Sequence, residues 1–242
     1  MKSSSTVAGS QVVVHRCRES HLYFPAPLAS LSIQKSSFST VFTGPVSPML
    51  SSPLTGFLQV RRVVRVSGCS EVTVVTAARR VVVQDCKNII LHLFTPNRPV
   101  LGRCRDITLA PFNANYKDIE QDFEQAGLER HQANLWDQPI VLRTGSSAGE
   151  VYRLLEPRLF TMFCLPTTLN LTIPFTTLPD QYNQAVLDKM EASIRWGKLV
   201  AGAELTPRQR GRLDQAVSRQ FRGWVASRKA VLEAGLTHLA TL

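Results

Sequence analysis

The sequence predicts a mainly β protein, a parallel β-helix followed by an α-helical C-terminal region. Three observations lead to this expectation. A run of apolar, often β-branched residues, a short polar pair and a cysteine recur every seventeen or eighteen residues, at 64–69, 81–86 and 100–104. A second short apolar run follows each cysteine, and helical periodicity is almost absent before residue 112. A fixed period of this kind is typical of stacked coils, in which one unit cannot bury its apolar face alone.

Weaker copies of the pattern lie nearer the N-terminus. Residues 12–17 repeat it with Cys17, and residues 31–36 repeat it with Ser36 in place of the cysteine. Stacking would bring like residues of successive units about 4.8 Å apart, the spacing of neighbouring strands. We therefore expect the first coil to begin near Val12.

The rung that ends at Cys86 shows which side chains should face outward. Successive side chains of a strand point to opposite faces. We expect Val81 and Val83 to point into the core, and Arg80, Val82 and Gln84 to point outward. The cysteines should begin the corners and point inward, because a small apolar side chain fits a tight bend.

One interruption breaks the ladder. The interval from Ser36 to Cys69 is 33 residues, nearly two periods, and its middle is rich in proline, serine and glycine. Proline cannot donate to a ladder of hydrogen bonds and is excluded from central strands. We interpret about 44–56 as an inserted surface loop, and expect a further rung to resume at 57–60.

The pattern divides the chain into four parts. These are a disordered N-terminus at 1–11, the β-helix at 12–112 with its insert, a capping helix and irregular segment at 113–178, and a helical tail at 179–242. In the third part, Ile119 and Phe123 lie on one helical face and Gly127 is a stop signal. We expect this short helix to cover an open end of the coil, whose edge groups would otherwise be unpaired.

The tail carries two helical patterns and the most basic segment of the chain. The first pattern runs over 180–199, and Thr206 followed by Pro207 is the start signal of the second. Between residues 195 and 229 there are nine Lys or Arg and two acidic residues. The ordinary explanation is a solvated outer face. The candidate basic contacts are Arg208, Arg210, Arg212 and Arg219.

No pattern for a metal or cofactor is found. Zinc sites need cysteines in close pairs, and none occurs here. Five cysteines make an odd number for disulfides, so we expect reduced thiols stacked in the core. The glycine-rich segment 144–149 lacks the lysine of a phosphate-binding loop and is interpreted as a linker.

Composition restricts the class of partner. The formal net charge of +10 suits an acidic protein surface, nucleic acid or an anionic membrane. No aromatic-interleaved basic motif supports nucleic-acid binding, and no stretch approaches the roughly 18 apolar residues of a transmembrane segment. The start lacks the apolar region of a signal peptide. We therefore expect a cytoplasmic protein with protein partners.

Three segments resemble the tubulin-binding cofactor C (C-CAP) domain family. They are AARRVVVQDC at 77–86, PVL at 99–101 and LAPFNANY at 109–116. Further similarity, at 134–139, 165–175 and 222–224, extends the resemblance over about residues 12–232. The resemblance implies that the β-helix is right-handed.

The same resemblance places a catalytic arginine four residues before a rung cysteine. GTPase activators of the family insert this arginine into the active site of tubulin or of an Arf-like small GTPase, where it stabilises charge on the transferring phosphoryl group. Here the position holds Val82, which has neither charge nor donor. The resemblance therefore implies a non-catalytic chain. The alternative is a GTPase activator that uses Arg80, about 7 Å away on the same face.

The resemblance also implies a cellular role and partners. We expect a cytoskeletal scaffold at the centrosome, basal body or spindle pole that acts in Golgi positioning and cell morphology. Its expected partners are tubulin or centrosomal and basal-body proteins, with an Arf-like GTPase as the second candidate. The candidate docking face comprises Arg79, Arg80, Val82 and Gln84.

Overall fold

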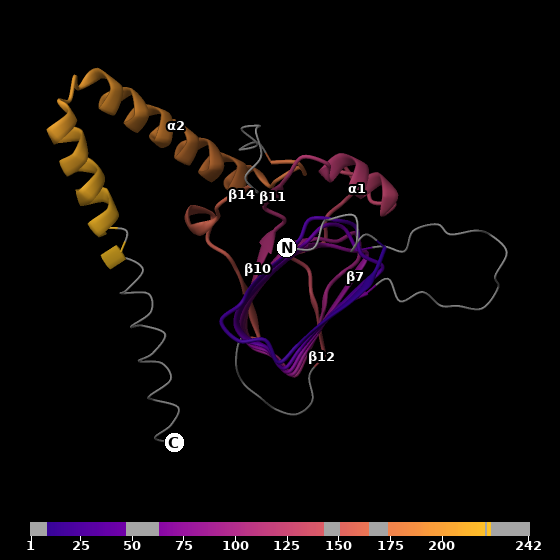
Figure 1. The fold of residues 1–242 in the computed structure, drawn as a ribbon. Coiled ribbons are helices and arrows are strands. Elements are labelled where there is room, and N and C mark those ends of the chain that lie inside the picture. Colours follow the sequence, from indigo (N-terminus) through magenta and orange to yellow (C-terminus); the bar gives the residue numbers. More distant parts are fainter. Residues whose placement is uncertain (1–8, 47–62, 143–150, 165–173, 221, 224–242) are drawn as a thin grey trace, which may run out of the picture. The chain divides into compact units, whose positions relative to one another are not determined.

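The computed structural model describes residues 9–46, 63–142, 151–164, 174–220 and 222–223 (Figure 1). The chain separates into two compact units, Met1–Asp188 and Lys189–Leu242. All strands of the described residues lie in the first unit. Several sequence expectations fall outside the described residues: most of 1–11, the insert from residue 47, the rung at 57–60, the linker at 144–149 and the segment at 165–173.

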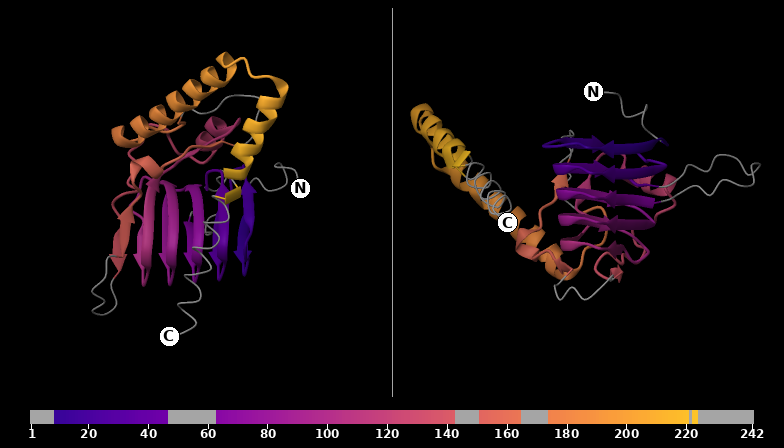
Figure 2. Two further views of the ribbon diagram at one scale, coloured as in Figure 1. Left: turned by 90° about the vertical axis from the view of Figure 1, so that its left-hand side faces the viewer. Right: turned by 90° about the horizontal axis from the view of Figure 1, so that it is seen from below.

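Two six-stranded parallel sheets form the first unit. Their strands are β1 (Gln11–His15), β3 (Ser30–Gln34), β5 (Val63–Ser67), β7 (Arg80–Gln84), β9 (Val100–Gly102) and β12 (Ile140–Leu142) in the first sheet, and β2 (His21–Phe24), β4 (Ser37–Thr43), β6 (Ser70–Ala77), β8 (Lys87–Phe94), β10 (Arg105–Pro111) and β13 (Tyr152–Leu154) in the second. The chain alternates between the sheets, so each strand pairs with the strand one coil later. Figure 2 shows the strands of successive coils side by side in chain order.

A short third row joins three successive coils. Leu28, Val46 and Ala78 form isolated parallel bridges in this row, and the N–H of Val46 donates to the carbonyl of Ala77 at 2.8 Å. The protein is therefore mainly β, built on two parallel sheets. The winding of these strands as a right-handed parallel β-helix stays a prediction.

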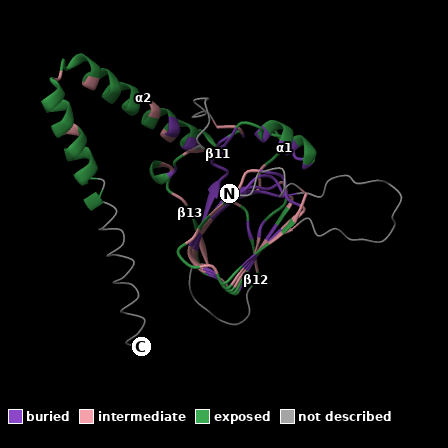
Figure 3. Ribbon diagram, in the orientation of Figure 1, coloured by how far each residue is buried: buried purple, intermediate pink, exposed green. Residues whose placement is uncertain are grey.

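The core lies between the sheets and consists of columns of like residues. In the first sheet, Ile33, Val66 and Val83 are in register and fully buried. In the second, Val41, Val74 and Leu91 form the matching column. The expected alternation in β7 is confirmed, because Val81 and Val83 are buried and the residues between and beside them are not. Figure 3 shows the burial along the ribbon.

The strands on either side of the interval between Ser36 and Cys69 are direct neighbours in both sheets. β3 pairs with β5, and β4 pairs with β6. The expected rung at 57–60 lies outside the described residues.

The ladder also does not stop at Pro111. β12 pairs with β9, and β13 pairs with β10, so each sheet gains a strand from beyond that residue. These two strands have three residues each and carry no cysteine at the corner. A separate two-stranded sheet joins β11 (Ala114–Asn115) to β14 (Phe163–Cys164).

The helix α1 (Ile119–Gln125) ends where the sequence predicts, with Gly127 at φ 62°. Its position differs from the expectation. Phe123 packs edge-on against Phe94 and Phe112, which come from two successive coils. The helix therefore covers the side of the stack across several coils rather than its open end. The Tyr116 hydroxyl donates a 2.7 Å hydrogen bond to Asp122 within α1.

The helix α2 (Asp180–Gly202) begins in the first unit. There Tyr182 packs edge-on against Trp136 and Phe160, after the 3₁₀ helix η2 (Pro157–Leu159). The second unit contains the rest of α2 and a helix at 207–220. The backbone N–H of Gln209 donates to the Thr206 hydroxyl at 3.4 Å, which confirms the expected helix start.

Candidate functional site

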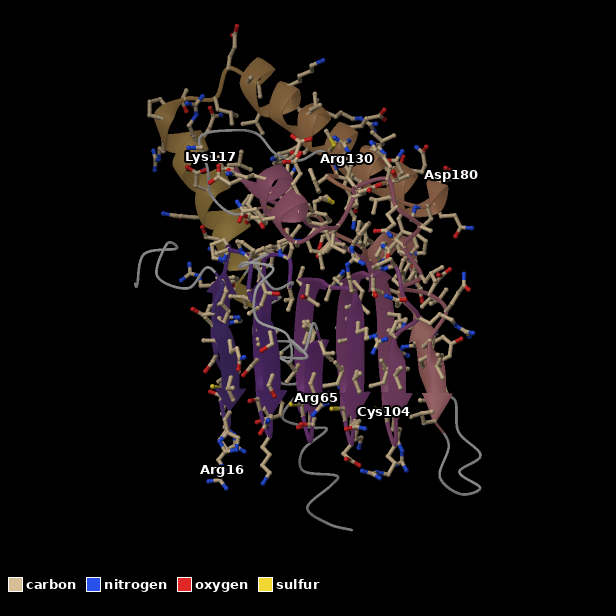
Figure 4. All side chains as sticks on the ribbon, turned by 90° about the vertical axis from the view of Figure 1, so that its right-hand side faces the viewer. Arg16, Arg65, Cys104, Lys117, Arg130 and Asp180 are labelled. Atoms are coloured by element: carbon tan, nitrogen blue, oxygen red, sulfur yellow. The ribbon has the colours of Figure 1, made fainter. Side chains whose placement is uncertain are left out.

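An outward column of side chains crosses the first sheet at the position expected for the catalytic arginine. The residues in register are Val13, Ser32, Arg65, Val82, Val100 and Ile140. This set is the Val82 column. Arg65 pairs with Val82 from the preceding coil. Arg65 is exposed and is labelled in Figure 4. Arg65 is also four residues before Cys69, so it occupies the equivalent position one coil earlier.

The candidate docking residues on β7 point outward as expected. Arg80 and Gln84 are exposed, and Val82 is half-buried between them. Among the described residues, Arg80 has no hydrogen bond or ion pair.

Arg79 differs from Arg80 in its surroundings. Its Nη2 donates a 2.7 Å hydrogen bond to the carbonyl of Gly127, just after α1. Its Nε is buried without a hydrogen-bond partner among the described residues. The Arg79 carbonyl accepts a 2.7 Å hydrogen bond from the side-chain amide of Asn97. The structure thus gives Arg79 a role in holding the turn after α1, and separates it from the outward face.

A hollow of about 510 Å³ opens beside Val82. We call it the Arg80 hollow. Its lining residues are Arg80, Val81, Val82, Asn97, Arg98, Val100, Leu135 and Ile140. They come from β7, the turn before β9, β9 itself, the irregular segment near residue 135 and β12. The register of three successive coils therefore builds the hollow.

The hollow has a cationic rim and an apolar floor. Arg98 stands two residues before Val100, as Arg80 stands two residues before Val82, and these two valines are paired. The Nε of Arg98 donates to the carbonyl of Gln138 at 2.9 Å, which fixes the side chain while leaving its other donors. No acidic residue lines the hollow. Such a site is suited to a ligand that carries both negative charge and an apolar group.

The other end of β7 is electrostatically neutralised. Arg103 contacts both carboxylate oxygens of Asp85, at 2.5 and 2.7 Å. This bidentate pair holds the pKa of the Asp85 carboxyl below its usual range. Asp85 is therefore paired with Arg103 rather than with the arginines near Val82.

The corner cysteines form a column that is structural. Cys69 and Cys86 are buried, whereas Cys17 and Cys104 are half-buried. The Cys86 sulfur accepts a hydrogen bond from the backbone N–H of Cys69 at 3.4 Å. The side-chain hydrogen bond with the Cys69 thiol, together with burial, raises the pKa of the Cys86 thiol. Within the described residues, no group of three His, Cys, Asp or Glu side chains could hold a metal ion.

The candidate basic contacts lie in the second unit. Arg208, Arg210, Arg212 and Arg219 are all exposed on the helix at 207–220. The same unit has a shallow hollow of about 410 Å³, lined by Trp196, Val200, Leu213, Asp214, Val217 and Ser218. In the part of the chain that the structure describes, no helix is both long and apolar enough to span a membrane.

Sequence reasoning missed Arg98, Leu135 and Ile140. They follow Arg80 by 18, 55 and 60 residues, and only the register of the coils brings them beside it. The repeat of spacing between Arg80 and Arg98 was a visible signal, because both precede an outward valine by two residues. Arg65 had a similar signal, its distance of four residues from Cys69.

Comparison with known proteins finds matches to the part of the chain that contains the hollow and to most of the rest. Residues 55–140 match the family model described as Tubulin binding cofactor C, a range that contains the Arg80 hollow. Proteins named TBCC domain-containing protein 1 align with 93% of this chain: at 31% identity over 230 residues in Mus musculus, 32% over 228 residues in Homo sapiens and 30% over 231 residues in Danio rerio. The chain spans 39%, 38% and 37% of the length of these three relatives. The resemblance found in the sequence is thereby confirmed: residues 55–140 carry the match to the tubulin binding cofactor C family, and nearly the whole chain is similar to TBCC domain-containing protein 1.

Proposed function

We propose that this chain acts as a non-catalytic cytoskeletal scaffold related to tubulin-binding cofactor C. The observation that carries the proposal is Val82 at the position of the family's catalytic arginine. A valine there supplies no charge to a transferring phosphoryl group. The outward face around it is regular and supported by packed coils, which suits docking of a protein partner.

The proposed location is the centrosome, basal body or spindle pole, with a role in Golgi positioning and cell morphology. The proposed partners are tubulin or resident proteins of those structures. The match to the tubulin binding cofactor C family supports a cofactor-related role. We also propose that the coils wind as a right-handed parallel β-helix, supported by the alternation of strands between two parallel sheets.

Location and hydrolysis together test the scaffold. A fluorescently tagged chain should coincide with a centrosomal marker in dividing cells. The purified chain should leave GTP hydrolysis by tubulin, and by an Arf-like GTPase, at its basal rate. A diffuse signal in cells would contradict the proposed location, and accelerated hydrolysis would contradict the absence of catalysis.

A second candidate function is GTPase activation through Arg80. The observation in its favour is that Arg80 is exposed, unpaired among the described residues and close to Val82. Activation that disappears in Arg80→Ala, while Arg105→Ala on β10 keeps it, would establish this function. The distance from the expected position argues against it, because contacts made only in the transition state tolerate little misplacement.

A further inference from the structure

We propose that the Arg80 hollow binds an extended acidic peptide segment, with carboxylates at the arginines and an aliphatic or aromatic side chain on the floor. This inference rests on the proposed function, in which the face around Val82 docks a protein partner. It adds the chemistry of the segment that is recognised. It also adds three residues, Arg98, Leu135 and Ile140, to the recognising surface.

The floor of the hollow provides the apolar half of the site. Val82, Val100 and Ile140 lie in register on three successive coils, so their side chains form a continuous strip. Ile140 is 41% exposed. The volume of about 510 Å³ lies within the range of roughly 300–1,000 Å³ that is typical of ligand pockets. One large apolar side chain would cover this strip and remove it from water.

The rim provides the charged half. Arg80 has no hydrogen bond or ion pair among the described residues, and Arg98 uses only its Nε, toward Gln138. Two guanidinium groups on successive coils repel each other unless an anion lies between them. Guanidinium matches the planar carboxylate with two parallel hydrogen bonds. Arg65, beside Val82 on the preceding coil, extends the positive field along the same column.

The hollow has no acidic lining residue, so its arginines favour a negatively charged ligand at this position. The nearest carboxylate along β7 is Asp85, which Arg103 already neutralises. A peptide with carboxylates close to an apolar residue satisfies both halves of the site together. A purely acidic peptide satisfies only the rim, and a purely apolar peptide satisfies only the floor.

Fluorescence anisotropy with labelled peptides tests this proposal on the full chain. The probes are a glutamate-rich peptide with one central leucine, the same peptide with serine in place of leucine, and a lysine-rich peptide with the leucine. We expect the first to bind, the second to bind at least tenfold more weakly, and the third not to bind. A tenfold change corresponds to about 1.4 kcal/mol of binding free energy. Binding of the first peptide should weaken as salt concentration rises.

Three variants locate the site. Arg80→Glu and Arg98→Glu should each weaken binding of the first peptide by tenfold or more. The matched control is Arg105→Glu, an exposed residue on β10 in the other sheet with the same change of charge. Because Arg98 also contacts Gln138, melting temperatures are compared, and Arg80→Gln serves as a second variant that removes only the charge.

The outcomes separate this inference from the proposed function. Equal losses in Arg80→Glu and Arg105→Glu would overturn the inference, because binding would then follow net charge alone. Equal binding of the leucine and serine peptides would overturn the role of the floor. If either occurs while the tagged chain still marks the centrosome, the scaffold stands and the acidic-peptide site does not. A phosphorylated peptide that binds tightly where the carboxylate peptide fails would also overturn it.

Discussion

The imidazole of His92 is enclosed in the second sheet. Its Nδ1 lies 3.4 Å from the carbonyl oxygen of Pro111, and its ring centroid is 6.0 Å from that of Phe160. Burial disfavours the charged imidazolium and lowers the pKa of His92 to about 4. The ring is therefore neutral in the folded protein at neutral pH, with its N–H available to the Pro111 carbonyl.

This shift predicts a pH dependence of stability. The unfolded imidazole has a pKa of about 6.5, so between about 6.5 and 4 the unfolded chain binds more protons than the folded one. The contribution of His92 is complete above about pH 6.5 and is lost as pH falls toward 4. The loss amounts to up to about 3 kcal/mol. The substitution His92→Gln keeps an N–H donor and does not titrate.

Urea unfolding at pH 7.5 and pH 4.5 measures the effect. The free energy of unfolding should fall more between these pH values in the natural chain than in His92→Gln. Carboxylates titrate in both proteins, so the difference between their losses of unfolding free energy reports the contribution of His92. Parallel losses in the two proteins would show that the imidazole is protonated without cost.

At the scale of the element, the coil corners repeat one hydrogen-bond pattern. The corner side chain donates to the carbonyl two residues earlier at every described corner of the first sheet, in the pairs Cys17 to His15, Ser36 to Gln34, Cys69 to Ser67, Cys86 to Gln84 and Cys104 to Gly102. Two of these side chains also accept a backbone N–H from the preceding coil, since Ser36 accepts from Cys17 and Cys86 accepts from Cys69. Serine and cysteine therefore form the same hydrogen bonds at this position.

This equivalence predicts an order of substitutions at Cys86. Cys86→Ser keeps both hydrogen bonds and should cost little stability. Cys86→Ala leaves the buried N–H of Cys69 without its acceptor, at a cost of about 1–3 kcal/mol. Thermal unfolding of the two variants checks the order. Equal or greater destabilisation by serine would show that the apolar character of the thiol matters more than its hydrogen bonds.

The sequence predicts these elements well where their positions depend on patterns between residues close in the chain. Alternation along one strand placed Val81 and Val83 in the core, and the period of the cysteines placed the coils in register. It failed where pairing depends on segments far apart. The strand β12 was missed because it is short, lacks the cysteine and follows α1.

The candidate site shows the same division. The outward position of Arg80 and Val82 follows from period two, and was predictable. The different role of Arg79 was not, because its partner Gly127 lies 48 residues away. The hollow was also not predictable, since Ile140 belongs to a coil that the periodicity did not reveal. The local sequence pattern therefore identifies the outward face of β7. The register of the coils determines which residues from other segments lie beside it.

At the scale of the first unit, the strands of each coil pair only with strands of the neighbouring coils among the described residues. In both sheets the strands follow one another in the order of the coils. In such an array, stability is a sum of coil terms and nearest-neighbour interfaces. A central coil has two interfaces and a terminal coil has one. Equal damage to the core should therefore have unequal effects along the stack.

Val83 and Val14 provide a matched comparison. Both are buried valines of the first sheet, but Val83 pairs with Val66 and Leu101, whereas Val14 pairs only with Ile33 among the described residues. Truncation to alanine removes the same atoms and costs about 2 kcal/mol at a core site. We expect Val83→Ala to lower the melting temperature of the whole unit, and Val14→Ala to act chiefly by local opening of β1 and β2. Hydrogen exchange by mass spectrometry distinguishes these outcomes, since Val14→Ala should speed exchange in the first coil while β7 to β10 stay protected. If both variants speed exchange equally in every coil, the stack unfolds as one cooperative body and its ends do not open separately.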